Sequence, residues 1–382
     1  MIKKLGTAIS EYSVRNKLDE DIPVYSVTNE QGFCTGYFSK DVASKDRTTY
    51  KIVPYGYFAY NPSRINVGSI DWQHSEERVI VSPLYVVFGV DESVDKRYLL
   101  HYLKSDIARM LIKNYASGSV RDNLKLSTLM EFPFNFRSLE EQKKIADVLD
   151  KIDNLIGVQK QRMDYFDRLV KSRFIELFGN PITNEMCWNQ VPLFTCVESI
   201  DNGKSFVCDS EARQGTSPAV LKLSAATYGD YRPEENKAIL DDKQFVEEAA
   251  VHSGDLLFTR KNTPELVGMC AYVYKTPVGL MMPDLIFRLN TTESCNKIFL
   301  WKLINHDLFR GCIQAIATGS AKSMSNISKE RLLKIKVILP PIELQKQFAA
   351  FVAQIDKSKL AVQQGLQELE TLKKSLMQQY FS

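Results

Sequence analysis

The sequence lacks the cysteine patterns of disulfide-framed and zinc-binding proteins. Its seven cysteines are scattered, their number is odd, and no C-x-x-C motif occurs. This usage indicates reduced thiols. Long apolar runs are also missing, because residues 79–90, the longest stretch, contain Ser82 and Pro83, and no apolar run follows Lys3 and Lys4. The sequence therefore indicates neither a membrane span nor a secretory signal, and we expect a cytoplasmic location.

Signatures of catalysis are absent too. The adenine-methyltransferase loop [ND]-P-P-[YFW] does not occur, since Asn61 and Pro62 are followed by Ser63. Neither a G-x-G-x-x-G nor a G-x-x-x-x-G-K-[ST] motif is found, which argues against a dinucleotide or P-loop site. The four histidines are isolated and belong to no H-E-x-x-H motif. We therefore predict no catalytic residue, no bound cofactor and no metal site in this chain.

The overall composition is that of a globular protein. The 382 residues are 44% hydrophobic and 25% charged, which allows real cores in two or three domains. The formal net charge is +3. So small a charge argues neither for nor against a nucleic-acid partner, because a basic face can lie within a balanced total.

Two long segments of the chain repeat each other. Residues 139–178 and 342–381 align without a gap after a shift of 203 positions, and Gln142 then meets Gln345. Their apolar residues recur in alternating steps of four and three, an average of 3.5 that is typical of coiled-coil helices. The predicted seam residues are Leu149, Ile152, Ile156, Met163, Phe166, Val170, Val352, Ile355, Val362, Leu366, Leu369 and Leu376.

Polar residues interrupt both seams. Gln159 and Arg173 do so in the first segment, and Lys359 and Lys373 in the second. These breaks fall at different levels of the two copies. That is expected if the helices pack antiparallel in one register, or if they meet other subunits there.

The repeat divides the chain into four segments. We predict a globular part at residues 1–136, a long helix at 137–180, a second globular part at 187–339 and a second long helix at 340–382. Val- and Tyr-rich runs between turn residues predict strands in both globular parts. Apolar periodicity predicts one helix over 95–114 and another over 296–317. Each is followed by a G-S-x-[KR] loop.

The duplication suggests a pseudo-two-fold arrangement. If the helices lie antiparallel, one chain presents two related globular parts in opposite senses, as a symmetric dimer does when it reads two half-sites of a duplex. The alternative is a coiled coil that serves only as an oligomerisation stalk.

With these features, nearly the whole chain resembles a specificity subunit of a Type I restriction-modification system. The repeated helices resemble the family's central and distal conserved regions. The sequence Y-N-P-S-R-I-N-V-G at 60–68 and G-D-L-L-F-T-R at 254–260 resemble segments of its target recognition domains. The resemblance implies an α+β fold, with two globular α/β recognition domains separated by two long antiparallel coiled-coil helices.

The same resemblance implies function and partners. Each recognition domain would read half of a bipartite DNA target, and the helices would set the gap and dock two modification subunits. Those methyltransferase subunits would carry S-adenosylmethionine. Restriction subunits, where present, would add an ATP- and magnesium-dependent endodeoxyribonuclease. The chain itself would be non-catalytic and would bind double-stranded DNA.

Candidate DNA-contacting residues follow from side-chain chemistry, because Arg reads guanine, Asn reads adenine, and Lys, Ser and backbone N–H groups hold phosphate. They are Asn61, Ser63, Arg64, Asn66 and Ser69 in the first part; Tyr228, Arg260, Lys261, Asn262 and Thr263 in the second; and Ser119, Arg121, Ser320 and Lys322 in the G-S-x-[KR] loops. The alternatives are polar turns for the first two groups, with a core-edge position for Tyr228, and helix C-caps for the loops.

Two other functions remain open at this point. A scaffold could use the long helices to gather partner proteins without a DNA role. A stand-alone enzyme would require turnover by the purified chain alone.

Overall fold

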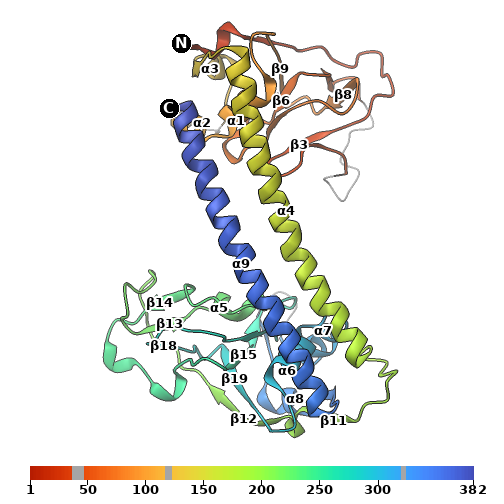
Figure 1. Ribbon diagram of the computed structural model, residues 1–382, viewed down its shortest axis with the longest axis vertical. Coiled ribbons are helices and arrows are strands. Elements are labelled where there is room, and N and C mark those ends of the chain that lie inside the picture. The colour runs from red at the N-terminus through yellow and green to blue at the C-terminus, as the bar shows by residue number, and fades with distance from the viewer. Residues whose placement is uncertain (37–46, 117–122, 320–323) are drawn as a thin grey trace. The chain divides into compact units, whose positions relative to one another are not determined.

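The chain folds into two compact units. The computed structural model describes residues 1–36, 47–116, 123–319 and 324–382. Unit 1 comprises residues Met1–Gln161 and Val362–Ser382, and unit 2 comprises residues Arg162–Ala361 (Figure 1). Each unit therefore contains one globular part and half of each long helix.

Both predicted long helices are confirmed. Helix α4 spans Leu139–Phe178 and helix α9 spans Ile342–Phe381. A capping box starts α4: Glu141 N–H donates to Ser138 Oγ (3.2 Å), and Ser138 N–H donates to Glu141 Oε2 (3.1 Å). Gly179 ends the helix in the left-handed region (φ +71°), where a glycine is favoured.

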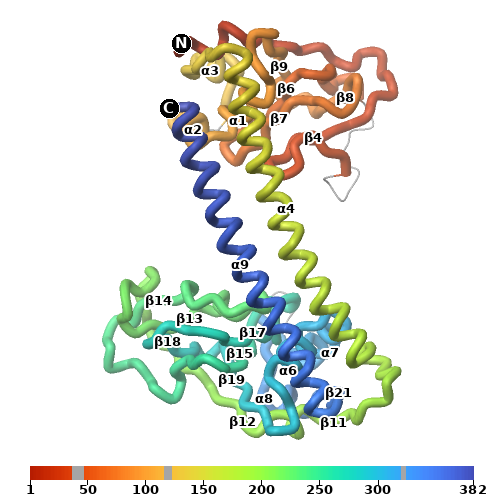
Figure 2. The backbone as a smooth tube through the Cα atoms, viewed as in Figure 1, coloured from red at the N-terminus to blue at the C-terminus, as the bar shows by residue number. Residues whose placement is uncertain are grey.

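The globular part of unit 1 is built on a four-stranded antiparallel sheet. Its order is β2 (Ile9–Glu11), β9 (Val86–Val90), β6 (Phe58–Tyr60) and β7 (Ile70–Trp72). Figure 2 labels the last three of these strands. Three antiparallel pairs complete it: β1 (Ile2–Lys4) with β10 (Pro133–Asn135), β3 (Ser26–Thr28) with β4 (Gly32–Cys34), and β5 (Lys51–Pro54) with β8 (Arg78–Val81).

Unit 2 repeats this sheet with the same connectivity. Its order is β12 (Val197–Asn202), β19 (Ile286–Thr291), β15 (Leu256–Thr259) and β17 (Cys270–Tyr272). A second sheet is β14 (Asn236–Ala238), β13 (Ala219–Leu221) and β18 (Leu280–Met281), and two pairs are β11 (Gln190–Pro192) with β21 (Lys336–Ile338) and β16 (Lys261–Asn262) with β20 (Ser325–Asn326).

Short helices flank the sheets. They are α1 (Lys96–Lys104), α2 (Asp106–Ala116), α3 (Leu126–Met130), α5 (Ser224–Thr227), α6 (Lys297–Asn305), α7 (Asp307–Ala315) and α8 (Lys329–Lys334). Single 3-10 turns occur at Leu5–Thr7, Ile65–Val67, Leu193–Thr195, Asp242–Gln244 and Glu247–Ala249.

The sequence predicted one helix where each unit has two. The breaks fall at Ser105 and His306, whose backbones are extended (ψ 158° and 131°). The side chain of each accepts a bond from an N–H group of the following helix: Ala108 N–H donates to Ser105 Oγ at 3.2 Å, and Leu308 N–H donates to His306 Nδ1 at 3.4 Å. The apolar period runs through both breaks, so only this capping chemistry marks them.

A buried glutamine attaches each globular part to a long helix. Gln142, on α4, is 0% exposed. Its Nε2 donates to the carbonyls of Ser93 and Arg137, both at 3.0 Å, and its Oε1 accepts from Asp95 N–H at 2.9 Å. Gln345, also 0% exposed, repeats all three bonds in unit 2, to Ser294 O (3.1 Å), Pro340 O (2.7 Å) and Asn296 N–H (2.8 Å).

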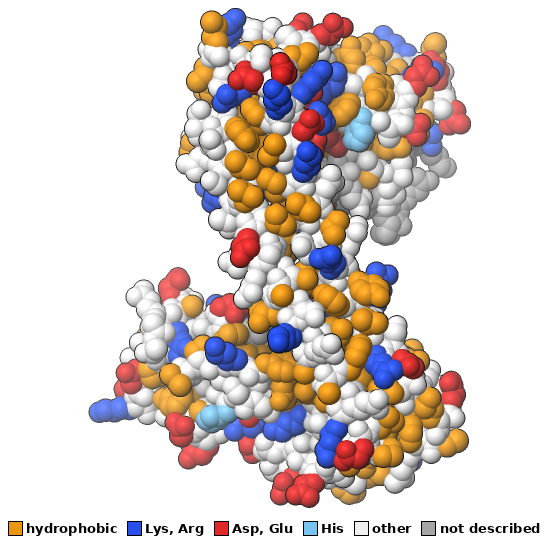
Figure 3. All heavy atoms as spheres, in the orientation of Figure 1, with side chains coloured by type: hydrophobic (Ala, Val, Ile, Leu, Met, Phe, Trp, Pro, Cys, Tyr) orange, Lys and Arg blue, Asp and Glu red, His pale blue; other side chains and the backbone are white. Residues whose placement is uncertain are grey.

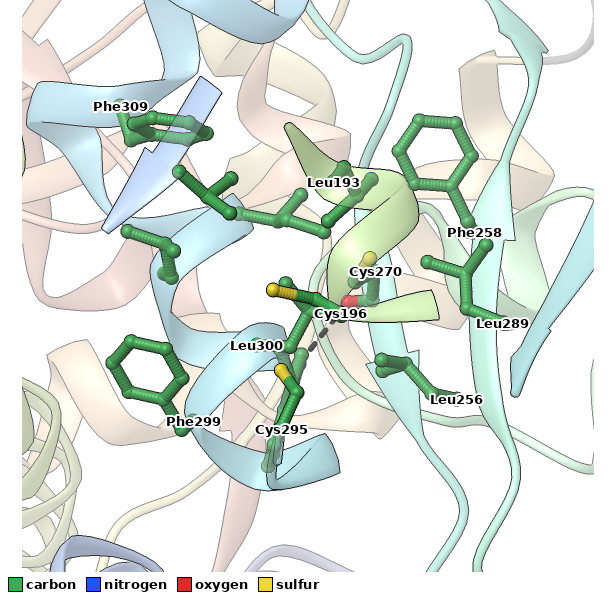
Figure 4. Packing of buried hydrophobic residues seen from close by; sticks show 14 of the residues in the cluster. Leu193, Cys196, Leu256, Phe258, Cys270, Leu289, Cys295, Phe299, Leu300 and Phe309 are labelled. Carbon is green, nitrogen blue, oxygen red and sulfur yellow. Dashed lines mark hydrogen bonds between the residues drawn. The ribbon is translucent and has the colours of Figure 1, made fainter. Parts of the chain in front are cut away.

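An aromatic side chain at the end of each long helix enters the core of a unit. In unit 1, the ring of Phe381 lies 5.2 Å from the ring of Tyr98. In unit 2, the ring of Phe178 lies 4.8 Å from that of Phe299. Figure 4 shows this second core, where side chains of β15 and β19 face α6. Burial raises the pKa of the Cys270 thiol there, so this cysteine packs as a small, neutral side chain.

The two long helices run antiparallel within each unit. In unit 1, Lys373 of α9 pairs with Asp153 of α4 at 2.5 Å, and in unit 2, Lys359 pairs with Asp167. In both pairs the two residue numbers add up to 526, as antiparallel pairing in one register requires. The two lysines that interrupt the apolar seam are thus matched by carboxylates on the facing helix.

The remaining seam positions pack as the heptad pattern predicts. Leu149, Ile152, Val170, Val352 and Ile355 are buried. The other predicted seam residues are half-buried: Ile156, Met163, Phe166, Val362, Leu366, Leu369 and Leu376. The pattern thus predicted the inward face of both helices.

Candidate nucleic-acid interface

The candidate turns of the two units occupy the same place in the same sheet. Residues 61–69 connect β6 to β7, and residues 260–269 connect β15 to β17. These strands hold equivalent positions in the two four-stranded sheets. The last residue but one of each connection is a glycine in the left-handed region, Gly68 (φ +89°) and Gly268 (φ +76°). Sequence motifs chosen separately therefore converge on one structural position.

The turn in unit 1 holds itself in shape and presents two polar side chains. Asn61 Oδ1 accepts from Ser63 N–H at 3.1 Å and from the Ser63 hydroxyl at 2.9 Å. Arg64 and Asn66 are exposed. Ser69 points inward instead: it is 3% exposed, and its hydroxyl donates to Val27 O at 2.6 Å. Ser63 is exposed as well, but its hydroxyl already donates to Asn61, which leaves Arg64 and Asn66 as the polar side chains open to a base edge.

The turn in unit 2 is more firmly held. Arg260 donates from Nε and Nη2 to Asn326 Oδ1 (3.4 and 3.3 Å), and its guanidinium lies 5.0 Å from the centre of the Phe287 ring. Asn262 is 7% exposed and donates to Thr227 Oγ1 at 3.0 Å. Lys261 is half-buried in β16, and Thr263 is exposed.

Tyr228 follows directly on the threonine that Asn262 contacts. The residue is 55% exposed, and the guanidinium of Arg232 lies 4.8 Å from the centre of its ring. Tyr228 and Arg232 thus form an aromatic–basic pair at the surface of unit 2. An exposed aromatic face beside a cation suits stacking on a base or contact with a sugar.

The third pair of candidates lies outside the described residues. Ser119 and Arg121 fall in the segment 117–122, and Ser320 and Lys322 in 320–323. The flanks of these segments are described. Leu124 N–H donates to Pro62 O at 3.2 Å, and Ile327 N–H donates to Arg260 O at 2.8 Å. In each unit a described residue that follows the G-S-x-[KR] segment in the sequence thus bonds to the candidate turn.

Sequence reasoning missed two basic residues beside these turns. Arg310 of α7 donates to Gly268 O (2.8 Å) and Val267 O (2.6 Å). Arg109 of α2 stands at the equivalent position of unit 1, and its Nη2 lies 3.8 Å from where a Cβ on Gly68 would be. Both arginines lie three residues after an aspartate in the predicted helices, but this spacing alone indicates no role.

Comparison with known proteins identifies the family. The family model described as the Type I restriction modification DNA specificity domain matches residues 3–164 and 197–371. The chain belongs to this family. The putative type I restriction enzyme MjaX specificity subunit of Methanocaldococcus jannaschii is 31% identical over 344 residues, which cover 82% of this chain and 77% of that protein.

Further relatives and solved structures agree. The EcoKI specificity subunit of Escherichia coli (strain K12) is 20% identical over 84% of this chain and 72% of its own length. The match to the Escherichia coli EcoEI specificity subunit is 29% identical but spans only 41% of this chain and 27% of that protein. The crystal structure of the S subunit from M. genitalium has the same fold, with a TM-score of 0.58 and 12% identity over 100% of this chain and 96% of that one.

Membership of this family determines the general role of the chain. Members are the specificity subunits of type I restriction-modification systems: they bind DNA, assemble with other subunits of the system and are not themselves catalytic. The fold predicted from the sequence, two α/β parts with long coiled-coil helices and an internal repeat, is confirmed. Among the described residues, no helix is long and apolar enough to cross a lipid bilayer.

Proposed function

We propose that each unit of this specificity subunit reads one half of a bipartite DNA target, and that the paired helices set the gap between the halves. The observation that carries the proposal is the shared position of the two turns, 61–69 and 260–269, in otherwise divergent units. A duplicated scaffold that places a turn at the same position in both units, with different residues in each turn, is suited to reading two different half-sequences.

The residues open to bases differ between the units. Arg64 and Asn66 suit guanine and adenine in unit 1. In unit 2, Thr263 and Tyr228 are exposed, and Arg260 is held by Asn326. The turns are supported by Lys261, Asn61, Ser63, Asn262 and Ser69. The small residues and the cations of the G-S-x-[KR] segments suit contact with a phosphate. The two half-sequences therefore differ, and the target is asymmetric.

The outer faces of the helices suit partner subunits. Val148, Leu155 and Val158 of α4 are exposed in unit 1, and Leu360 of α9 is exposed in unit 2. Figure 3 shows hydrophobic side chains gathered over the helices in this view. Exposed apolar residues on a coiled coil favour further helix packing. The proposed occupants are two modification subunits, in the cytoplasm, that carry S-adenosylmethionine; restriction subunits would bring ATP and magnesium.

Mapping adenine methylation in the host genome, with and without this gene, tests the proposal. The expected result is a split motif that disappears with the gene. Replacing Arg64 by Ala is expected to relax one half-sequence and leave the other unchanged, because a bidentate base contact contributes about 1–3 kcal/mol of discrimination. Lys17→Ala, an exposed lysine outside the turn, serves as the control. Methylation that is unaffected by loss of the gene would contradict the proposal.

A further inference from the structure

A cavity of 920 Å³ lies in unit 1 beside the candidate turn. It is lined by the β3–β4 turn, the α1–α2 junction and the facing surfaces of α4 and α9. Its basic lining residues are Lys104, Arg109, Lys160, Lys373 and Lys374. The corresponding cavity of unit 2, at the α6–α7 junction, measures 320 Å³. The larger size and the run of cations distinguish the cavity of unit 1.

Two of these cations are already paired. Lys373 contacts Asp153 at 2.5 Å, and Lys374 lies 3.8 Å from Asp106. Lys104 and Arg109 differ, because among the described residues neither side chain makes a hydrogen bond or an ion pair within 4 Å. Burial lowers the pKa of Lys104, while the carboxylates of Asp71 and Asp153 act in the opposite direction. An anion in the cavity would relieve this penalty.

The equivalent positions of unit 2 show what these residues would otherwise do. Lys104 and Arg109 correspond to Asn305 and Arg310, each 201 positions later in the chain. Asn305 Nδ2 donates to Cys270 O (2.8 Å), and its Oδ1 accepts from Cys270 N–H (2.9 Å). Arg310 donates to the carbonyls of Val267 and Gly268. Both side chains of unit 2 therefore secure the backbone of β17 and the turn before it.

The side chains of Lys104 and Arg109 in unit 1 do not make such bonds to the backbone. The turn near Gly68 is covered by Asn29, whose Oδ1 lies 2.3 Å from where a Cβ on Gly68 would be, so a side chain at this position would clash. The guanidinium of Arg109 is exposed next to it. A planar fork of donors with a lysine on the preceding helix is the chemistry that binds a phosphate.

From this asymmetry we propose that Arg109 and Lys104 bind a backbone phosphate of the DNA and thereby position the turn at residues 61–69 on its half-target. The proposal rests on the DNA-reading role proposed above. Unit 2 lacks this anchor, because its arginine already bonds to the protein backbone. Four acidic side chains also line the cavity: Asp106 and Asp153, which pair with Lys374 and Lys373, and Glu30 and Glu370. They limit the site to a phosphate that the two cations hold directly.

The test is the salt dependence of duplex binding by the assembled complex. One phosphate contact contributes about 0.9 to the slope of log Kobs against log salt concentration. Arg109→Gln is expected to lower the slope by about that amount and to weaken binding to all sequences alike. Lys104→Gln is a second variant with the same expected direction. Lys113→Gln, an exposed lysine of α2 that does not line the cavity, is expected to leave the slope unchanged.

The outcomes separate this proposal from the one it rests on. An unchanged slope in Arg109→Gln, with normal duplex binding by the wild type, overturns the phosphate anchor and leaves the reading role intact. Thermal protection by inorganic phosphate that disappears in Arg109→Gln, without any change in the duplex slope, assigns the cavity to a free anion and also overturns the anchor. A wild-type complex that binds no duplex overturns both proposals.

Discussion

In both units a glutamine side chain on a long helix bonds to the equivalent backbone groups of the globular part, whereas the side-chain contacts around it differ between the units. Gln142 and Gln345 make equivalent bonds. Beyond them, unit 1 uses charge: Arg97 contacts Asp147 (2.7 Å) and Asp150 (2.9 Å). The equivalent positions of unit 2 carry Ile298, Ala350 and Ala353. Duplication has thus retained the side chain that satisfies buried backbone groups and has let the surrounding contacts diverge.

The largest expected effect comes from removing either glutamine. Gln142→Ala or Gln345→Ala leaves one N–H group and two carbonyls without their partner, at a cost of about 3 kcal/mol. Because a chain of two units need not unfold in a single two-state transition, hydrogen exchange, which reports on each unit, is the appropriate measurement. Faster exchange is expected in α1 for Gln142→Ala and in α6 for Gln345→Ala.

An exposed glutamine on the same helix provides the matched control. Gln364→Ala, on α9, should leave exchange in both units unchanged. If only one of the two substitutions speeds exchange, the two glutamines make equivalent bonds but do not stabilise their units equally. That result would contradict the comparison.

A smaller effect is expected from Asp150→Asn, and only in unit 1. Burial alone would raise the pKa of Asp150, but its bonds to His101 (2.7 Å) and Arg97 outweigh burial and lower it. An aspartate with a lowered pKa stabilises the fold above its unfolded pKa of about 3.9, and this stabilisation is lost as the pH falls through the lower folded value. The carboxylate is partly exposed, so the expected loss at neutral pH is about 1 kcal/mol.

The measurement is hydrogen exchange in α1 and α6 of wild type and variant at several pH values. The wild type is expected to lose protection in α1 below about pH 4, and the variant to show less of that loss. Equal responses in α1 and α6 would show that the charged contacts of unit 1 are not what distinguishes the two units.

The long helices could be predicted from the sequence because a repeated 3.5-residue period and clear stop signals determine them. The position of the candidate turns was also accessible, through residues 60–68 and 254–260. The breaks at Ser105 and His306 were not, since capping side chains produce them without disturbing the apolar pattern. The sequence did not indicate the proposed role of Arg109. That role depends on a tertiary difference, because Arg310 bonds to the protein backbone and Arg109 does not.

The most direct test of the central claim is a change in the length of the helices. Because paired residue numbers add up to 526, a heptad inserted after Gln159 requires another after Leu366 to keep the register. Each insertion adds about 10 Å of helix, or about three base pairs of duplex. Adenine-methylation mapping should then show a longer gap between unchanged half-sequences. Altered half-sequences, or an unchanged gap, would contradict the account.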